Sequence, residues 1–560
     1  MLHAIGRACS GFLITKRIRA VADRFQDWTL PAFKEIPGRK WIATLSFLSL
    51  SLPVWGEEVL QWQPLDLPFE SSKEHPWWEF PVRAEFIREG DPQLSLAVKG
   101  FWDGENRWTI RAALPKPGIW SWKTESEDPE LDGLKGQIEV IEPERDQIVW
   151  NPNLRGAIRI SESNRSFEYS DGTPFLMLAS TLWAGNTARC GLGPNQNGPF
   201  YQHLKDRKSK GFNTILMQYF HGYGDYPESL GHRNEGGKPY ADIQTKELNP
   251  KHFQFLDVRM KALWGLGFVL ATPTTWWGKT QNCVFSPEDA IRMSTYCAVR
   301  YGAFNSIWSL SGEYQYAFQD CGWTPSDFTV LGEAVQRHNP FSRPLSIHPS
   351  GRINWPPPHD VQSSRPFHGE SWLDHHWLQT GQSRDRLFNI VTRLAENRRL
   401  TPTVPVFCSE AFYEHVDDSL HAYHSRWQVW TAFLNGACGF GYGEQGLWQF
   451  YDPADPAGDV GKDTGRDLPW HEVQMLEGAG QVKYARLLLE QFEWWKLSPA
   501  SRQLRIDKAP NSMPTSTDIS PPQAAQFEDH AWILYLPRGN QGKTIAIQST
   551  FEKPLQLHWM

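Results

Sequence analysis

The sequence predicts an α/β protein whose largest part is a (β/α)8 TIM barrel, preceded by a β-sandwich and followed by a short β segment. The barrel is predicted because short apolar runs alternate with amphipathic runs over residues 155–500, and eight such units can be counted. The sandwich is predicted over residues 58–147, where short alternating runs are broken by turn residues. A length of 560 residues also exceeds one ordinary core and favours several domains.

Residues 1–56 are predicted to be an export leader, or signal peptide. A basic lead-in at residues 38–40 precedes an apolar run over residues 41–50, and Val54 and Gly56 place small residues at −3 and −1 before Glu57. The apolar run is too short to stay in a bilayer as an anchor. We therefore expect a periplasmic or secreted protein that begins near Glu57 and has no membrane contact after cleavage.

The sandwich is expected to contain five alternating strands. They are residues 82–87, 94–98, 108–112, 120–124 and 136–140. The pattern implies a structural domain, and no chemistry is assigned to it.

The barrel is expected to contain eight parallel strands with its active site at their carboxyl ends. The predicted strands are residues 175–180, 214–219, 267–272, 306–310, 344–348, 372–376, 405–409 and 436–442. Amphipathic runs lie between them. Residues 501–560 are expected as the C-terminal β segment, because a stretch rich in Pro, Ser and Thr is followed by a few short strand-like runs.

The composition points to a neutral, polar partner. Charged residues make up 21% of the chain and the net charge is −7, which gives no reason to expect nucleic acid. The chain has 28 Trp, 16 Tyr and 31 Phe, and flat aromatic faces are surfaces on which sugar rings stack. The partner we expect is an oligosaccharide or polysaccharide, although any single Trp is as readily a core residue.

Two glutamates are the candidate catalytic residues, because each follows an apolar strand of the predicted barrel. Glu313 comes after the run 306–310, and Glu410 comes directly after the run 405–409. These are strands four and seven, whose carboxyl ends face one another across the pocket. Carboxylates about 5–5.5 Å apart suit double displacement with retention. Glu410 would attack the anomeric carbon, and Glu313 would protonate the leaving oxygen and then activate water. The alternative for each is a structural pair with an arginine.

Several motifs along the predicted barrel resemble those of one known family. Residues 300–308 followed by Gly312-Glu313 resemble the fourth-strand motif of apiosidase-like glycoside hydrolases, once a family of unknown function. Further matches follow in order: Lys210-Gly211-Phe212-Asn213, His348-Pro349-Ser350-Gly351, Trp372-Leu373-Asp374, Pro405-Val406 with Glu410, and Tyr442-Gly443 with Trp448. The resemblance covers most of residues 155–500. It implies that Glu313 is the acid/base and Glu410 the nucleophile, although the family often has Asp at the position of Glu313. The preceding segment resembles the small sandwich often found before such barrels.

Other strand-end residues are weaker candidates for substrate binding, since each is as readily a packed support residue. They are Trp183, His221, Trp276, Trp277, Tyr314, His348, Asp374, Gln379, Tyr413, Tyr442 and Trp448.

No cofactor or metal is expected. Asp374, His375 and His376 are adjacent, and neighbours on a strand point to opposite faces, so they do not share a metal easily. No phosphate-binding loop or nucleophile elbow is found. Among the seven cysteines, Cys190, Cys283 and Cys321 lie in loop-like sequence and could pair, while Cys297, Cys408 and Cys438 are expected as buried thiols.

The sequence therefore predicts an exported, retaining glycoside hydrolase that acts on plant or microbial polysaccharide. Two alternatives stay open. One is a catalytically silent carbohydrate-binding protein on the same barrel. The other is an inverting glycosidase, which needs a wider gap between the carboxylates. The sugar, the linkage, endo or exo action and the oligomeric state stay open as well.

Overall fold

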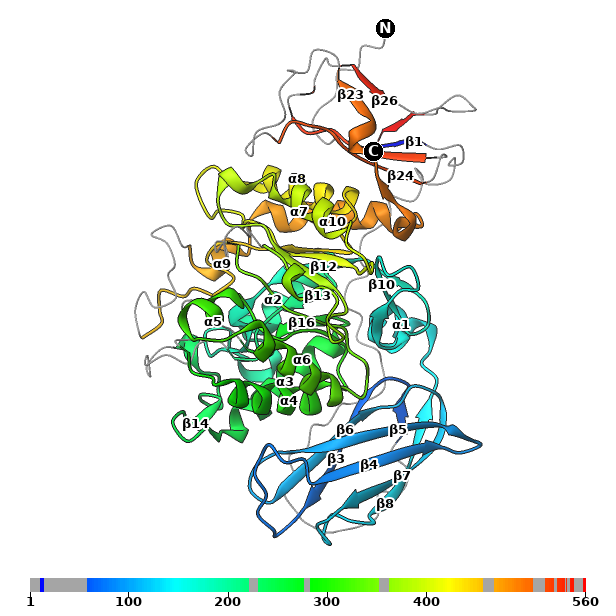
Figure 1. Ribbon diagram of the computed structural model, residues 1–560, viewed down its shortest axis with the longest axis vertical. Coiled ribbons are helices and arrows are strands. Elements are labelled where there is room, and N and C mark those ends of the chain that lie inside the picture. The colour runs from blue at the N-terminus through cyan, green and yellow to red at the C-terminus, as the bar shows by residue number, and fades with distance from the viewer. Residues whose placement is uncertain are drawn as a thin grey trace.

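A computed structural model describes residues 11–14, 58–220, 230–275, 283–351, 362–456, 468–506, 519–527, 531–538, 540, 544–547 and 557–559. Figure 1 shows three regions stacked along the long axis of the molecule: an N-terminal β domain, a central barrel and a C-terminal β sheet. The α/β class and the barrel predicted from the sequence are confirmed by this arrangement.

The N-terminal domain is a seven-stranded sheet in the order β2-β8-β7-β4-β5-β6-β3, folded around its own core. Its strands are β2 (Glu58–Leu60), β3 (Pro64–Glu70), β4 (Val82–Arg88), β5 (Asp91–Trp102), β6 (Arg107–Ala113), β7 (Gly118–Ser126) and β8 (Lys135–Ile141). All pairs are antiparallel except β2 with β8. The long strand β5 pairs with β4 over residues 91–99 and with β6 over residues 100–102, so it joins the two layers.

The barrel is an eight-stranded parallel sheet in the order β18-β17-β16-β13-β12-β21-β20-β19. Its strands are β12 (Met177–Thr181), β13 (Thr214–Leu216), β16 (Val269–Pro273), β17 (Ser306–Ser309), β18 (Leu345–Ser346), β19 (His376–Gln379), β20 (Val406–Glu410) and β21 (Gly439–Tyr442). Each overlaps a predicted strand. The sixth is displaced, since it begins at His376, where the predicted run 372–376 ends.

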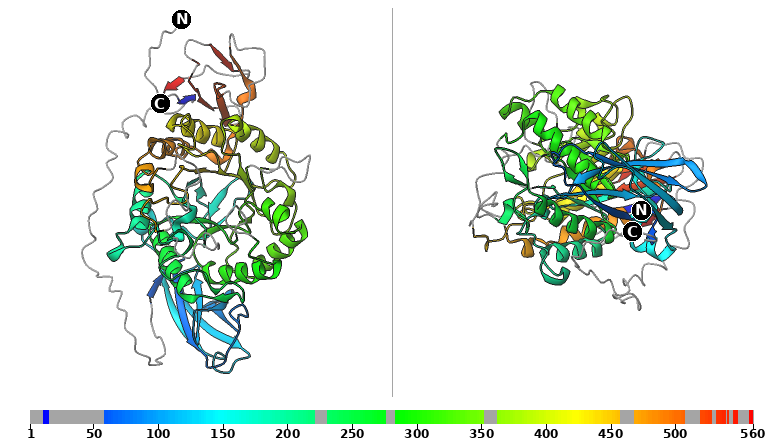
Figure 2. Two further views of the ribbon diagram at one scale, coloured as in Figure 1. Left: turned by 90° about the vertical axis from the view of Figure 1, so that its left-hand side faces the viewer. Right: turned by 90° about the horizontal axis from the view of Figure 1, so that it is seen from below.

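Helices surround the barrel, as the turned view in Figure 2 shows. They are α1 (Arg145–Trp150), α2 (Pro199–Ser209), α3 (Pro250–Gly265), α4 (Pro287–Tyr301), α5 (Gln315–Asp320), α6 (Pro325–Arg337), α7 (Asn389–Asn397), α8 (Ala422–Leu434), α9 (Trp470–Val473) and α10 (Glu477–Leu489). Four of them, α2, α3, α4 and α6, begin at a proline, whose fixed φ suits the first helical turn.

Side chains along each strand point alternately into the barrel and toward the helices, so two apolar layers form. Side chains such as Met177, Ile307 and Phe407 fill the barrel interior, and that core is closed at the amino end of the strands by a small sheet. This sheet consists of β9 (Ile158–Ile160), β10 (Phe167–Tyr169) and β11 (Pro174–Phe175). A second and larger layer packs between the strands and the helices.

Side chains bridge the seam between β18 and β19, which are the two ends of the strand order. The Leu345 amide donates to Asp374 Oδ2 at 2.8 Å, and the Ser346 hydroxyl donates to the His375 carbonyl at 2.6 Å. The Ser364 hydroxyl donates to the carbonyl of Ile347 at 2.7 Å on the same side. Side-chain hydrogen bonds thus replace part of the backbone hydrogen bonding that normally joins two adjacent strands.

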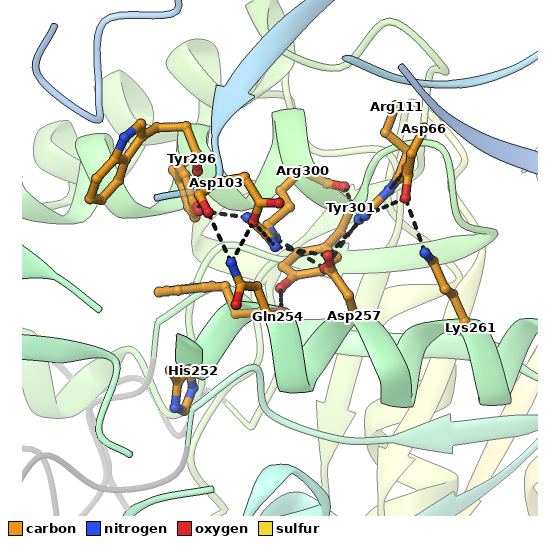
Figure 3. A network of polar contacts seen from close by, with 12 residues as sticks. Asp66, Asp103, Arg111, His252, Gln254, Asp257, Lys261, Tyr296, Arg300 and Tyr301 are labelled. Atoms are coloured by element: carbon orange, nitrogen blue, oxygen red, sulfur yellow. Dashed lines mark hydrogen bonds and ion pairs between the residues drawn. The ribbon is translucent and has the colours of Figure 1, made fainter. Parts of the chain in front are cut away.

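The first two domains are joined by a buried charge network, shown in Figure 3. Asp257 of α3 lies between Arg111 of β6, at 2.9 Å, and Arg300 of α4, at 2.7 Å. Arg111 also binds Asp66, and Arg300 binds Asp103 at 2.8 Å. Burial alone would raise the pKa of Asp257, but the two guanidinium groups hold it below its usual value. The network fixes the sandwich against the barrel wall through α3 and α4.

The C-terminal sheet has the order β22-β24-β25-β1-β27. Its strands are β22 (Ser498–Pro499), β24 (Gln523–Phe527), β25 (Ala531–Tyr535), β1 (Gly11–Ile14) and β27 (Leu557–Trp559), and β23 (Leu504–Ile506) pairs separately with β26 (Ile545–Ile547). Strand β1 lies within residues 1–56, which we predict to be an export leader. The edge of β25 offers backbone groups to which the short run 11–14 adds as a strand. Cleavage before Glu57 would remove it and stays a prediction.

Candidate active site

A β-bulge turns Glu410 toward the interior of the barrel. Strands β19 and β20 pair Trp377 with Phe407 and then Gln379 with Glu410, so β20 has one residue more than β19 between the two pairs. Simple alternation from Phe407, which faces inward, would have turned Glu410 toward the helices. The extra residue resets the alternation, as bulges beside active sites do. Glu410 is only 5% exposed as a result.

Glu313 reaches the same region from the segment after β17. Backbone hydrogen bonds continue beyond the strand, from the Leu310 amide to the Ser346 carbonyl and from the Gly312 amide to the Thr275 carbonyl. Glu313 itself has a φ of 50°, which a residue with a side chain adopts at an energetic cost. The surrounding bonds hold this conformation, and the half-buried side chain lies at the carboxyl end of the barrel.

One amide group links the two candidate catalytic residues. Gln379, the last residue of β19, donates through Nε2 to Glu410 Oε1 at 2.9 Å and to Glu313 Oε1 at 3.4 Å. An amide nitrogen carries two hydrogens, so both contacts can be made at once. The two Oε1 atoms therefore lie no farther apart than the sum of these two lengths.

Further donors surround Glu410. Gln382 donates from Nε2 to the same Oε1 atom at 2.9 Å, and its own oxygen accepts the Tyr413 amide at 2.8 Å. His348 Nε2 lies 3.3 Å from Glu410 Oε2. Burial, followed by the charge of the nearby Glu410, raises the pKa of Tyr413 above its ordinary value.

Aromatic side chains hold these donors in place. Trp183 Nε1 donates to the Tyr413 hydroxyl at 3.0 Å, and its ring lies 5.6 Å from that of His348. The Tyr413 ring lies on Gly443, where a Cβ would come within 2.1 Å of it, so only glycine permits this approach. Trp448 is partly buried and packs on the interior core beside these residues. Of the predicted binding residues, the structure thus brings Trp183, His348, Gln379 and Tyr413 together around Glu410, and Trp448 packs on the interior core.

Three other predicted binding residues lie elsewhere. Tyr314 is buried among Phe318, Phe328 and Phe367, and its hydroxyl donates to the Ser363 carbonyl. Asp374 precedes β19 and bonds to the first residue of β18, so it lies at the amino end of the strands, away from the glutamates. These placements correct the substrate-binding roles expected for Tyr314 and Asp374.

Tyr442 needs the same correction, because it faces the helices. It packs in the outer core with Phe212, as alternation along β21 requires once Gly439 and Gly441 face inward. Its hydroxyl lies 2.6 Å from Glu414 Oε2 and 3.0 Å from Glu444 Oε1, and Arg207 pairs with Glu444. We call these four side chains the buried glutamate cluster. The remaining three candidates, His221, Trp276 and Trp277, lie outside the described residues.

Sequence reasoning missed Gln382, which touches both Glu410 and the Tyr413 backbone. Its signal was present in the run from Gln379 to Gln382, where two glutamines flank Thr380 and Gly381 at the end of a strand. The displaced boundary of the sixth strand concealed it, since the predicted strand ended at His376.

The cysteines form one disulfide within the described residues. Cys283 and Cys321 are bonded, with their Cα atoms 5.2 Å apart. Cys190, Cys297, Cys408 and Cys438 are buried free thiols. In the part of the chain that the structure describes, no group of three His, Cys, Asp or Glu residues is placed to hold a metal. Within the same residues, no helix has the length and apolarity needed to cross a membrane.

An eight-stranded parallel barrel with two glutamates linked at its carboxyl end is the arrangement of a glycoside hydrolase. A family model described as the apiosidase-like catalytic domain matches residues 161–496, well over half of the chain. The chain therefore belongs to the apiosidase-like family and is a glycoside hydrolase with a carbohydrate substrate. A second model, a domain of unknown function (DUF5060), matches residues 58–127 within the sandwich.

Solved structures show the same fold. A protein of Bacteroides vulgatus ATCC 8482, provisionally assigned as a glycoside hydrolase, is similar with a TM-score of 0.58 at 20% identity, over 78% of this chain and 79% of that one. A family 5 glycoside hydrolase of the same organism gives 0.55 at 20% identity, over 68% and 80%. A third structure, described as a glycoside hydrolase, gives 0.54 at 19% identity, over 68% and 83%. No curated protein matches the chain.

Proposed function

We propose that this enzyme cleaves a glycosidic bond in a plant or microbial polysaccharide by retaining double displacement, with Glu410 as nucleophile and Glu313 as general acid/base. The observation that carries the proposal is the amide of Gln379, which bonds to both carboxyl groups at once. Two carboxyl groups on one small donor are close enough to act on the same glycosidic bond.

The donors around Glu410 support the nucleophile assignment. Amide groups that hydrogen bond to a carboxylate stabilise its charge and fix its orientation. Gln379 and Gln382 hold one oxygen, and His348 lies beside the other. A carboxylate held in this way is ready to attack an anomeric carbon without first rotating.

Glu313 suits the second role because it is more accessible. Its side chain is half-buried, whereas Glu410 is almost fully buried. A general acid/base must give its proton to the leaving oxygen and later take one from water, so access to solvent serves both steps. Protonated Glu313 would release the first product, and ionised Glu313 would activate water against the glycosyl-Glu410 ester.

The spacing supports retention over inversion. Inverting enzymes keep their carboxyl groups about 6.5–9.5 Å apart to admit a water, whereas retaining enzymes keep them about 5–5.5 Å apart. The shared contacts of 2.9 and 3.4 Å at Gln379 bring one oxygen of each carboxyl group close together, and a short spacing of this kind favours retention.

The disulfide supports export, which we propose as the second part of the function. Cys283 and Cys321 are bonded near the protein surface, and disulfides persist in the periplasm and outside the cell. Cleavage before Glu57 would release a free protein. Intact mass spectrometry of the mature protein tests this, and a mass that retains residues 41–56 would show an anchored protein instead.

The activity is tested by screening the purified protein against pectic, hemicellulosic and algal glycans. We expect release of sugar from at least one class, and the loss of that release in Glu410→Gln. Glu472→Gln is the matched control, because Glu472 is exposed on α9. A product whose anomeric configuration is inverted in its first NMR spectra would contradict retention. Binding without hydrolysis on every glycan would favour the silent carbohydrate-binding alternative.

A further inference from the structure

A cavity lies at the opposite end of the barrel from the glutamates. It has a volume of about 130 Å³, and its lining includes Arg165, Arg398, Trp494 and Trp495. Leu176 and Ala437, which also line it, come just before β12 and β21, so the cavity lies at the amino ends of the strands. A single water needs only about 10–15 Å³ on this scale, so the space suits a small ligand.

Two arginines from separate segments meet at this cavity. Arg165 comes from the turn between β9 and β10, and Arg398 directly follows α7. Arg165 donates to the Arg398 carbonyl at 3.1 Å, and Arg398 donates to the Gly436 carbonyl at 2.9 Å. Gly436 has a φ of 84°, and a Cβ there would come within 2.5 Å of the Arg398 guanidinium. The absence of a Cβ at Gly436 therefore allows the Arg398 guanidinium to lie against the backbone there.

Neither guanidinium forms an ion pair with a carboxylate of the described residues. The buried Arg111, Arg207, Arg259 and Arg300 all bind carboxylates, whereas the buried Arg343 bonds to two backbone carbonyls and Asn305. Burial, and then the like charge of Arg165, lower the pKa of Arg398 to about 10. Lys496 at the rim is exposed and engaged by Glu493 at 2.8 Å. Positive charge at the cavity is thus left without an anionic partner.

The other walls are aromatic. Trp494 is buried and Trp495 is partly buried, and their rings meet edge to face at 5.9 Å. Such walls exclude water and strengthen any charged contact made beside them. A planar guanidinium matches the two oxygens of a carboxylate or sulfate group, and an indole face can pack on a sugar ring.

We propose that this cavity is a binding site for a small oxyanion, a carboxylate or sulfate group that is either free or carried on a sugar. Arg398 and Arg165 bind the oxyanion oxygens, and Trp494 and Trp495 form the wall behind them. The site lies away from Glu313 and Glu410, so it does not depend on the proposed catalytic mechanism.

Isothermal titration calorimetry of the full-length protein tests the proposal with three ligands at matched ionic strength: sodium sulfate, sodium glucuronate and glucose. We expect saturable binding of sulfate or glucuronate and no heat from glucose. Tighter binding of glucuronate would indicate a sugar-borne oxyanion, and equal or tighter binding of sulfate would indicate a free ion. Either result supports the site.

Arg398→Gln and Arg165→Gln should each weaken that binding by roughly tenfold or more, because each removes charge-assisted hydrogen bonds. The matched control is Arg399→Gln, which makes the same charge change at the next position on an exposed side chain. Arg398→Lys keeps the charge but loses the planar fork, and it should also bind more weakly. Glycan hydrolysis should be unchanged in all four variants. Absence of anion binding by the native protein, or equal binding by Arg398→Gln and Arg165→Gln, would overturn the proposal.

Discussion

The barrel contains two pairs of glutamates, and in each pair the two side chains are linked through one shared group. The two pairs differ in the side chains that contact their carboxyl groups. Glu410 accepts from the amides of Gln379 and Gln382, the first of which also bonds to Glu313, and the ring of His348 lies beside Glu410. In the buried glutamate cluster, Glu414 and Glu444 share the hydroxyl of Tyr442, and the cation Arg207 is bonded to Glu444.

The difference shows which pair is suited to chemistry. A permanent cation held against a carboxylate neutralises it and ties up its lone pairs, so the buried pair stabilises the fold. Neutral amides orient a carboxylate but leave its charge available for reaction. The barrel therefore holds four glutamates near three strand ends, and we propose that only two of them act in catalysis.

The same substitution in each pair should give opposite results. Glu410→Gln should lower kcat by about four orders of magnitude or more, with little change in the urea midpoint. Glu444→Gln should lower the free energy of unfolding by about 3 kcal/mol, because Arg207 loses a buried partner and keeps Asp206. Folded Glu444→Gln should keep native kcat. If Glu444→Gln loses activity while its stability is unchanged, the distinction between the pairs fails.

The next prediction concerns the hydrogen bonds from Gln379 to the two glutamates, which a substitution can remove. Gln379→Met has a similar shape but no donor, and it should lower kcat/KM by roughly 10- to 100-fold through the loss of a hydrogen bond to a charged group. Gln491→Met, on an exposed side chain, is the matched control and should be neutral. Steady-state kinetics measure both. Native kcat/KM in Gln379→Met would mean that the bridge does not position the pair.

The buried glutamate cluster should make stability depend on pH. One hydroxyl proton cannot serve two carboxylates, and burial raises the pKa of both, that of Glu444 to about 7. The folded protein then holds a proton that the unfolded chain releases between its ordinary pKa of 4.5 and about 7. Stability should therefore fall as pH rises through this window. Urea unfolding at pH 5 and pH 7.5 should show a smaller fall in Glu444→Gln than in the native protein. An equal fall would contradict the shared proton.

The smallest effect is expected at Asp374, where the structure replaces a binding role with a structural one. Asp374→Ala should cost about 1 kcal/mol of stability, because the Leu345 amide loses its acceptor. Asp374→Asn keeps an acceptor oxygen and should be nearly neutral. Burial raises the pKa of Asp374 to about 6, so an uncharged amide suits the site. A fall in kcat/KM with unchanged stability would restore the substrate-binding role.

The sequence predicted the strand positions better than the direction of their side chains. Apolar runs located all eight barrel strands, because burial on both faces leaves a continuous apolar signal. The side chain of Tyr442 was misjudged because the inward positions of β21 are glycines, which carry no apolar signal. Asp374 was misplaced because the sixth strand starts later than its apolar run.

The two glutamates were chosen as candidates because Glu410 directly follows an apolar run and Glu313 comes three residues after one, but their geometry was not in the sequence. The bulge that turns Glu410 inward appears only when β19 and β20 are paired. Strand pairing is a long-range property, and no local pattern encodes it. Gln379 was recognised as a strand-end residue, yet its contact with both carboxyl groups depends on that same register.

The central claim is that Glu410 forms a covalent intermediate that Glu313 helps to resolve, and Glu313→Gln tests it most directly. With an aryl glycoside that has a good leaving group, attack by Glu410 needs no acid, so glycosyl-enzyme should accumulate and mass spectrometry should find the sugar on the peptide that carries Glu410. Azide, which needs no general base, should restore turnover and give a glycosyl azide of retained configuration by NMR. A glycosyl azide of the opposite configuration, or a trapped sugar on another residue, would contradict the assignment.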